Sequence, residues 1–151
     1  MNQSPHAEPK SRTRIRYDDL LSAFEWVSAA APSEHSAFVS RQTGRLHWAS
    51  SSHDLEEELP EDIDDASLYV AVPHKYDLDL GKDLVRRFAD EVLPGSSDTI
   101  VAFFHRRGAY ARFKDFLERR ACLQAWYDYE TKATEAALRE CCEENGLQLV
   151  P

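Results

Sequence analysis

The chain is poor in the features that mark several classes of protein. It has three cysteines in 151 residues, and because the number is odd and Cys141 and Cys142 are adjacent, the set is a poor framework for disulfides and fits a reducing compartment. No apolar run approaches the roughly 20 residues that a transmembrane helix needs. The first 16 residues contain no apolar segment of the kind that a secretory signal requires. We therefore expect a cytoplasmic protein without membrane partners.

Signatures of common chemistries are missing as well. The chain has no Walker loop, no G-x-S-x-G and no H-E-x-x-H. Its adjacent cysteines lack the two-residue spacer of a zinc knuckle, and its six histidines show no ligand spacing. An EF-hand loop that began at Asp77 would need a glutamate where the chain has Phe88. The sequence thus predicts no cofactor and no metal, with a magnesium site at Asp77 and Asp79 as a less favoured alternative.

Negative charge is what the chain has in excess. Its 27 acidic and 18 basic residues give a formal net charge of −9, which argues against nucleic acid as a generic partner. Eight carboxylates lie between Asp54 and Asp65, in a segment that Pro60 interrupts. We interpret this segment as a solvated loop, with a short helix inside it left open. Binding of a divalent metal or mimicry of nucleic acid is the alternative function.

Hydrophobic periodicity predicts one α+β domain over residues 17–151, preceded by a disordered tail over residues 1–16. The predicted order is an N-terminal helix over residues 17–30, a small antiparallel sheet of about three strands, and a C-terminal run of four helices. Strands and helices are segregated along the chain, which favours an antiparallel sheet over a parallel βαβ arrangement. For the tail, a basic arm that docks on a partner is the alternative.

The predicted sheet begins with a hairpin over residues 36–50. Gln42, Thr43 and Gly44 suit a three-residue loop with glycine in the left-handed conformation. That loop would place Phe38 opposite Trp48. Residues 68–72 form the third predicted strand, which Pro73 ends because proline cannot donate a ladder hydrogen bond.

Helical spacing returns after this strand. The four helices are predicted over residues 79–93, from about Ser97, over residues 109–120 and over residues 123–144. Asp79 is expected to cap the first of them. Gly108 is expected to join the second and third in a left-handed conformation, and Asn145-Gly146 to end the last. A further strand over residues 147–150 is an open possibility.

The densest group of cations lies in residues 105–120. It contains six Lys or Arg residues and two acids. At the junction around Gly108, backbone N–H groups of a helix start would lie beside arginines, which suits a phosphate or a carboxylate. Salt bridges along one solvated helix, such as Asp115 with Arg119, are the competing interpretation.

A second candidate segment follows the third strand. His74 can act as an acid or a base near neutral pH, and Lys75 can bind an anion. However, no nucleophile is placed beside His74 by the sequence, so a structural histidine is the competing interpretation.

Several short segments of the sequence together resemble a known bacterial family. They are residues 17–20 and 23–28, Thr43-Gly44 with Trp48, residues 57–65, Pro73-His74-Lys75, residues 77–81, residues 106–115 and Asn145-Gly146. The family is uncharacterised protein family 0158, and the resemblance extends over about residues 17–150. It implies a small bacterial cytosolic protein. It brings no established activity, cofactor or catalytic residue.

We expect a non-enzymatic binding or regulatory module, without an assigned catalytic residue, that engages an anionic ligand or an acidic partner at the basic helix junction. The alternative is a small enzyme that acts on a phosphate-bearing substrate such as RNA, with His74 or His105 as the acid or base. The ligand-binding residues that we predict are His74, Lys75, Arg106, Arg107, Tyr110 and Arg112, with Lys114 beside them.

Overall fold

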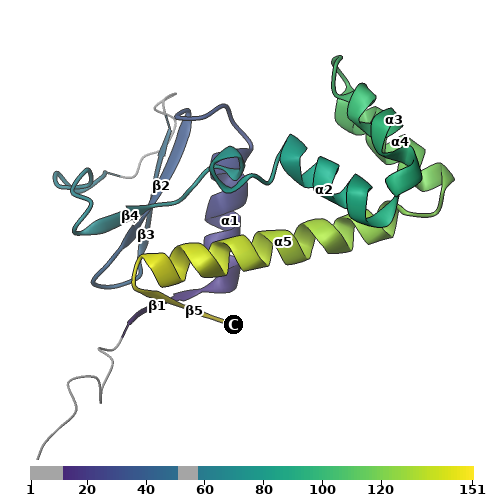
Figure 1. Ribbon diagram of the computed structural model, residues 1–151. Coiled ribbons are helices and arrows are strands. Elements are labelled where there is room, and N and C mark those ends of the chain that lie inside the picture. The colour runs from purple at the N-terminus through teal and green to yellow at the C-terminus, as the bar shows by residue number, and fades with distance from the viewer. Residues whose placement is uncertain (1–11, 51–57) are drawn as a thin grey trace, which may run out of the picture. The chain divides into compact units, whose positions relative to one another are not determined.

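The computed structural model describes residues 12–50 and 58–151, which fall into two compact units (Figure 1). The first unit lies within residues 1–72 and 139–151, and the second is Pro73–Leu138. Among the described residues, no helix combines the length and the apolar character that a membrane span requires.

The first unit contains one helix and five strands among the residues described. They are β1 (Thr13–Arg16), α1 (Tyr17–Ser28), β2 (His35–Ser40), β3 (Leu46–Ser50), β4 (Tyr69–Ala71) and β5 (Leu147–Val150). The strands β3, β2 and β4 form an antiparallel sheet in that order, and β1 pairs with β5 in parallel. The predicted α+β character and the three-stranded antiparallel sheet are confirmed.

The predicted order, with a helix first, is wrong because β1 precedes α1. This strand lies in the stretch that we assigned to the disordered tail, while residues 1–11 are outside the described part of the chain. Ile15 is buried with 3% of its surface exposed, opposite Leu149 of β5. A strand is recognised in a sequence by alternating apolar and polar residues. In β1 only Ile15 is fully buried, so this alternation is absent and the strand could not be predicted.

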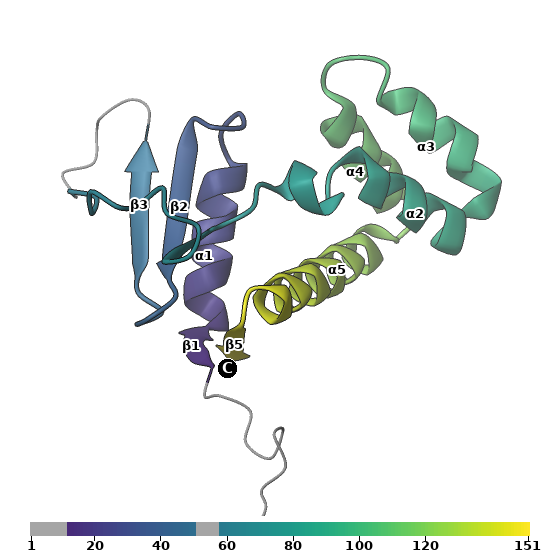
Figure 2. The same ribbon diagram turned by 60° about the vertical axis from the view of Figure 1, so that its left-hand side comes forward.

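The helix α1 packs on β2, and Figure 2 shows the two side by side, with β1 and β5 together at one end of the helix. Leu20, Ala23, Phe24 and Val27 are its buried residues, at the spacing predicted for one helical face. Full burial of each larger apolar side chain contributes about 1.5–3 kcal/mol. This face therefore fixes the helix on the sheet.

The hairpin of β2 and β3 differs from the prediction in its register. Ala37 lies opposite Trp48, and Phe38 lies opposite His47. The predicted pairing of Phe38 with Trp48 is wrong by one residue, and a slip of one residue exchanges the two faces of a strand.

The cause is a loop of four residues rather than three. The amide of Ser40 donates to the carbonyl of Arg45 at 2.9 Å, and the amide of Gly44 donates to the carbonyl of Ser40 at 2.8 Å. The Ser40 hydroxyl oxygen also accepts hydrogen bonds from the amides of Gln42 and Thr43, both at 3.2 Å. Gly44 has the predicted left-handed conformation, with φ 78°.

The second unit is built from helices. They are the 3-10 helices η1 (Lys75–Leu78) and η2 (Pro94–Ser96), and the α-helices α2 (Lys82–Val92), α3 (Ser97–Phe103), α4 (Ala109–Arg119) and α5 (Leu123–Glu144), whose last residues belong to the first unit. The predicted run of four α-helices is confirmed. Gly108 joins α3 to α4 with φ 75°, and Gly146 follows α5 with φ 71°, as the sequence predicted.

Aromatic rings form the centre of this unit. Phe88, Phe113 and Trp126 each expose 1% of their surface or less. Trp126 meets the rings of Phe88 and Phe113 edge to face, with centroids 5.3 and 5.0 Å apart. Such edge-to-face pairs add about 0.5–1.5 kcal/mol to the burial of each ring, so α2, α4 and α5 share one core.

One local prediction needs correction. Asp79 does not cap α2: its backbone is left-handed, with φ 55°, and it ends η1, while Gly81 precedes α2. The Asp79-x-Gly81 pattern is compatible both with a helix cap and with a left-handed turn. The sequence alone therefore could not distinguish the two. Residues 58–66 of the acidic segment form a loop with turns, as predicted, and residues 51–57 lie outside the described part of the chain.

Candidate functional site

The second unit contains all six residues predicted to bind a ligand. One of them, His74, has a structural role. His74 exposes 6% of its surface. Its Nδ1 accepts a hydrogen bond from the amide of Tyr76 at 3.1 Å, and its own amide donates to the carboxylate of Asp77 at 3.0 Å. These reciprocal bonds cap the 3-10 helix η1. The His74 Nδ1 atom is therefore already engaged by the backbone of η1.

Arg112 is also engaged with the backbone. Its Nη2 donates to the carbonyl of Phe103 at 3.0 Å and to the carbonyl of Arg106 at 3.1 Å. The carbonyls at a helix end lack partners within the helix, and a guanidinium is well suited to them. Arg112 therefore holds the start of α4 against the end of α3.

Arg106 and Arg107 lie exposed in the turn between α3 and α4. Their side chains make no hydrogen bond or ion pair with the residues that the structure describes. From residue 99 to residue 114 the chain contains no Asp or Glu at all. This turn therefore presents uncompensated positive charge, and the predicted anion site at the junction stays a prediction.

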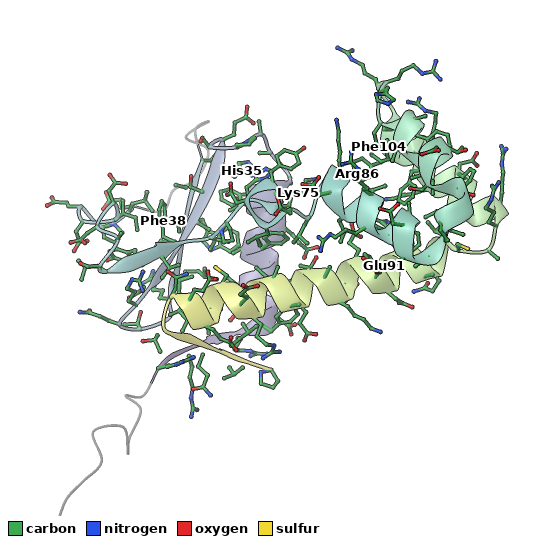
Figure 3. The ribbon with its side chains drawn as sticks, in the orientation of Figure 1. His35, Phe38, Lys75, Arg86, Glu91 and Phe104 are labelled. Atoms are coloured by element: carbon green, nitrogen blue, oxygen red, sulfur yellow. The ribbon has the colours of Figure 1, made fainter. Side chains whose placement is uncertain are left out.

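A groove between α2 and α3 adjoins the same segment. It is a pocket of about 200 Å³ lined by Lys82, Val85, Arg86, Val101, Phe104 and His105. Arg86 and Phe104 lie close together in Figure 3. Three of the lining residues are apolar, among them the buried Val85, and Lys82 and Arg86 add two positive charges beside His105. We call this site the α2–α3 groove.

The cations of the α2–α3 groove have no resident counter-ion. Within the described part of the chain, the side chains of Lys82, Arg86 and His105 form no hydrogen bond and no ion pair. Lys82 and Arg86 did not enter the predicted site. Their spacing of four residues on a predicted helix, beside the buried Val85, was the signal that could have found them.

Charge is unevenly distributed between the two units. Pro73–Leu138 contains eleven Lys or Arg and eleven Asp or Glu residues, so its formal charge is zero. The net charge of −9 belongs entirely to the remaining sequence. The net charge of the unit that carries the α2–α3 groove therefore does not repel an anion.

A second, larger pocket lies on the other side of Lys82. It has a volume of about 430 Å³ and is lined by Tyr76, Asp79, Gly81, Lys82, Asp83 and Tyr110. Tyr76 and Tyr110 expose 59% and 38% of their surfaces. Burial, and then the proximity of Tyr76 and Glu130, raise the pKa of Tyr110, so its hydroxyl stays protonated at neutral pH. We call this site the tyrosine pocket.

Lys75 and Lys114 lie near an acid and near aromatic rings. Burial raises the pKa of Glu130 in α5, and the charges of Lys114 and Lys75 act in the opposite direction. The Lys75 ammonium is 5.5 Å from the centroid of the Tyr76 ring, and that of Lys114 is 5.6 Å from the centroid of the Tyr127 ring. These lysines are therefore partly compensated within the unit, unlike Arg106 and Arg107.

The exposed end of α4 carries the salt bridge predicted for a solvated helix. Arg119 Nη2 lies 3.1 Å from the Asp115 carboxylate, with the two side chains 76% and 61% exposed. A pair in such a position contributes at most about 1 kcal/mol. Asp115 and Arg119 thus compensate each other's charge locally.

Metal ligation has no support in the described part of the chain, and one of the three thiols is kept protonated by burial. No three His, Cys, Asp or Glu side chains there are placed to hold a metal ion. Cys122, Cys141 and Cys142 are free thiols, and burial raises the pKa of Cys142 to about 11. A thiol with that pKa is protonated at neutral pH and is a poor nucleophile.

No family model, curated protein or solved structure matches this chain. The resemblance to uncharacterised protein family 0158 therefore stays a prediction from the sequence. Function has to be inferred from the side chains of the second unit.

Proposed function

We propose that this protein is a non-enzymatic binding module whose α2–α3 groove receives an acidic segment of a partner protein. One observation carries the proposal: Lys82 and Arg86 line the groove together with Val85, Val101 and Phe104, and neither cation has a counter-ion among the described residues. Arg106 and Arg107 continue the positive surface beyond the groove.

The arrangement favours an anion because of where the cations lie. A charged group beside apolar surface is less well screened than one in open water, so an ion pair formed there is stronger. The Arg86 guanidinium can also donate two parallel hydrogen bonds to one carboxylate. A carboxylate at the rim would thus be bound by both charge and geometry.

The size of the groove favours a peptide over a free metabolite. Pockets that enclose small molecules usually measure about 300–1,000 Å³, whereas the groove measures about 200 Å³. It accommodates one apolar side chain, for which Val85, Val101 and Phe104 supply contacts. An apolar anchor in a pocket, surrounded by polar contacts, is how protein interfaces concentrate their binding energy.

The enzyme alternative has less support. His74 caps η1 and Arg112 binds backbone carbonyls. Neither residue lines the α2–α3 groove or the tyrosine pocket. His105 lines the groove, but no lining residue there is a carboxylate, a hydroxyl or a thiol with which it could act.

A labelled acidic peptide tests the proposal. The sequence Asp-Asp-Phe-Asp-Asp carries four carboxylates around one aromatic anchor, and its binding is followed by fluorescence anisotropy at low ionic strength. We expect Arg86→Ala to weaken binding about tenfold, which corresponds to about 1.4 kcal/mol. Replacing the peptide's Phe by Ser should weaken it further, because the anchor no longer fills the groove.

Arg119→Ala is the matched control. It removes the same charge from the unit, but Arg119 is paired with Asp115 at the end of α4. Its effect on binding should be small. If the two variants weaken binding equally, the peptide is attracted only by the net charge of the unit. The proposed binding site in the groove is then wrong.

A further inference from the structure

We infer that the tyrosine pocket binds an organic cation of the alkylammonium class. The site is distinct from the α2–α3 groove, and the inference does not depend on the proposed function. Two exposed tyrosine rings, Tyr76 and Tyr110, and two carboxylates, Asp79 and Asp83, line this pocket together.

The combination of rings and carboxylates selects the ligand. The face of an aromatic ring is electron-rich and attracts a cation within about 6 Å of its centroid, which is how ammonium groups are recognised by aromatic cages. Asp79 and Asp83 supply negative charge, and their carboxylates make no hydrogen bond or ion pair with the described residues. Calcium or magnesium would need a shell of oxygen ligands, which the rings cannot offer.

The rings are held in place before any ligand arrives. A Cβ atom at Gly81 would lie 3.0 Å from two atoms of the Tyr76 ring, so this ring lies directly on the glycine backbone. The Tyr110 ring meets Phe104 edge to face, with centroids 5.0 Å apart and planes at 87°. Binding therefore requires little ordering of side chains, which raises affinity.

The two carboxylates are positioned by the backbone. Asp79 lies in a left-handed turn whose carbonyl accepts a hydrogen bond from Arg87 Nη2 at 3.0 Å. Asp83 lies in the first turn of α2, where the helix dipole favours negative charge. Lys82 is the one cation that lines the pocket, so the lining has a net charge of −1.

The Lys75 ammonium lies 5.5 Å from the centroid of the Tyr76 ring, so a bound cation shares this ring with Lys75 and depends chiefly on Tyr110 and the two carboxylates. The volume of about 430 Å³ also lies in the range that encloses small ligands, roughly 300–1,000 Å³. The pocket thus has the chemistry and the size for a methylated ammonium group.

Choline chloride is the first probe, titrated into the full chain and followed by the amide chemical shifts of η1 and α2. Tyr110→Leu should weaken binding about fivefold or more, because one aromatic face is lost. Asp83→Asn should also weaken it. Asp98→Asn is the matched control, since Asp98 occupies the first turn of α3 as Asp83 does that of α2, and it should leave the affinity unchanged.

A blocked peptide with one trimethyllysine is the second probe and distinguishes the source of the ammonium group. Equal affinity for both probes indicates a free small molecule, and tighter binding of the peptide indicates a cation carried by a protein. Either result supports the cation site. Absence of binding by both probes overturns it, as does equal loss of affinity in Asp83→Asn and Asp98→Asn.

Lys82→Gln separates this site from the proposed function, because Lys82 lines both pockets. Removal of its charge should strengthen choline binding in the tyrosine pocket and weaken binding of the acidic peptide in the α2–α3 groove. If the variant weakens choline binding, the cation site is wrong, whatever the acidic peptide does.

Discussion

The side chain of Arg112 donates a hydrogen bond from Nη2 to the backbone carbonyl oxygen of Phe103, at 3.0 Å. This bond connects the first turn of α4 to the last residue of α3. Between them, Gly108 turns the chain with φ 75°. A residue that belonged to the predicted anion site thus maintains the junction on which Arg106 and Arg107 are displayed.

Replacement of Arg112 should therefore affect folding. We expect Arg112→Ala to lower the free energy of unfolding by about 2 kcal/mol, because charged hydrogen bonds to two carbonyls are lost. Arg106→Ala, at an exposed position, should change it by less than about 0.5 kcal/mol. Urea denaturation measures both values. Full stability of Arg112→Ala would show that the guanidinium is not needed at the junction.

His74 should behave as a helix cap. His74→Ala removes the acceptor for the Tyr76 amide and should cost about 1 kcal/mol, the usual value for a lost cap. His74→Asn keeps a side-chain acceptor and should recover most of this loss. If alanine and asparagine destabilise the protein equally in thermal or urea unfolding, the capping role is wrong.

Gly44 and Gly146 form a matched pair. Both have left-handed backbones, with φ 78° and 71°, but a Cβ at Gly44 would lie against the carbonyl of Arg14, whereas one at Gly146 would meet nothing within 4 Å. Gly146→Ala should cost about 1 kcal/mol for the backbone alone. Gly44→Ala should cost clearly more, because the hairpin loop must move away from β1. Equal losses on denaturation would contradict the close approach of loop and strand.

Glu130 gives a prediction about pH. Burial raises its pKa above the ordinary value of 4.5, so the folded state binds this proton more tightly than the unfolded chain does. The resulting stabilisation is complete below pH 4.5 and is lost as the pH rises through the raised pKa. Glu130→Gln should therefore gain stability relative to the wild type between pH 4 and pH 7.

Denaturation at both pH values measures this difference, with Glu118→Gln on α4 as a control for the loss of one negative charge. A gain by Glu130→Gln that does not change with pH would contradict the raised pKa.

The sequence predicted most of the helices and the antiparallel sheet, because these depend on local pattern. The apolar stripes of α1 and α2 and the left-handed glycines Gly108 and Gly146 are examples. The strand β1 and the register of the hairpin could not be predicted in this way. The strand that contains Ile15 pairs with β5, about 130 residues later in the chain. The four-residue loop that sets the register is closed partly by hydrogen bonds to the Ser40 side chain.

The candidate site was predicted less completely. Arg106 and Arg107 are as exposed as a dense cationic segment suggests. The sequence could not reveal that Arg112 and His74 bind the backbone, because their partners are carbonyl and amide groups that every residue has. Lys82 and Arg86 become relevant only when α2 packs beside α3 and brings them to His105.

The most direct test of the proposed function is to map the acidic peptide on the protein by ¹⁵N–¹H correlation spectra. The account predicts that the amide shifts change most at residues 82–86 and 101–107, and that Arg86→Glu abolishes these changes while Arg119→Glu preserves them. Shifts spread evenly over the basic residues of the chain, or no shifts at all, would contradict a binding site in the α2–α3 groove.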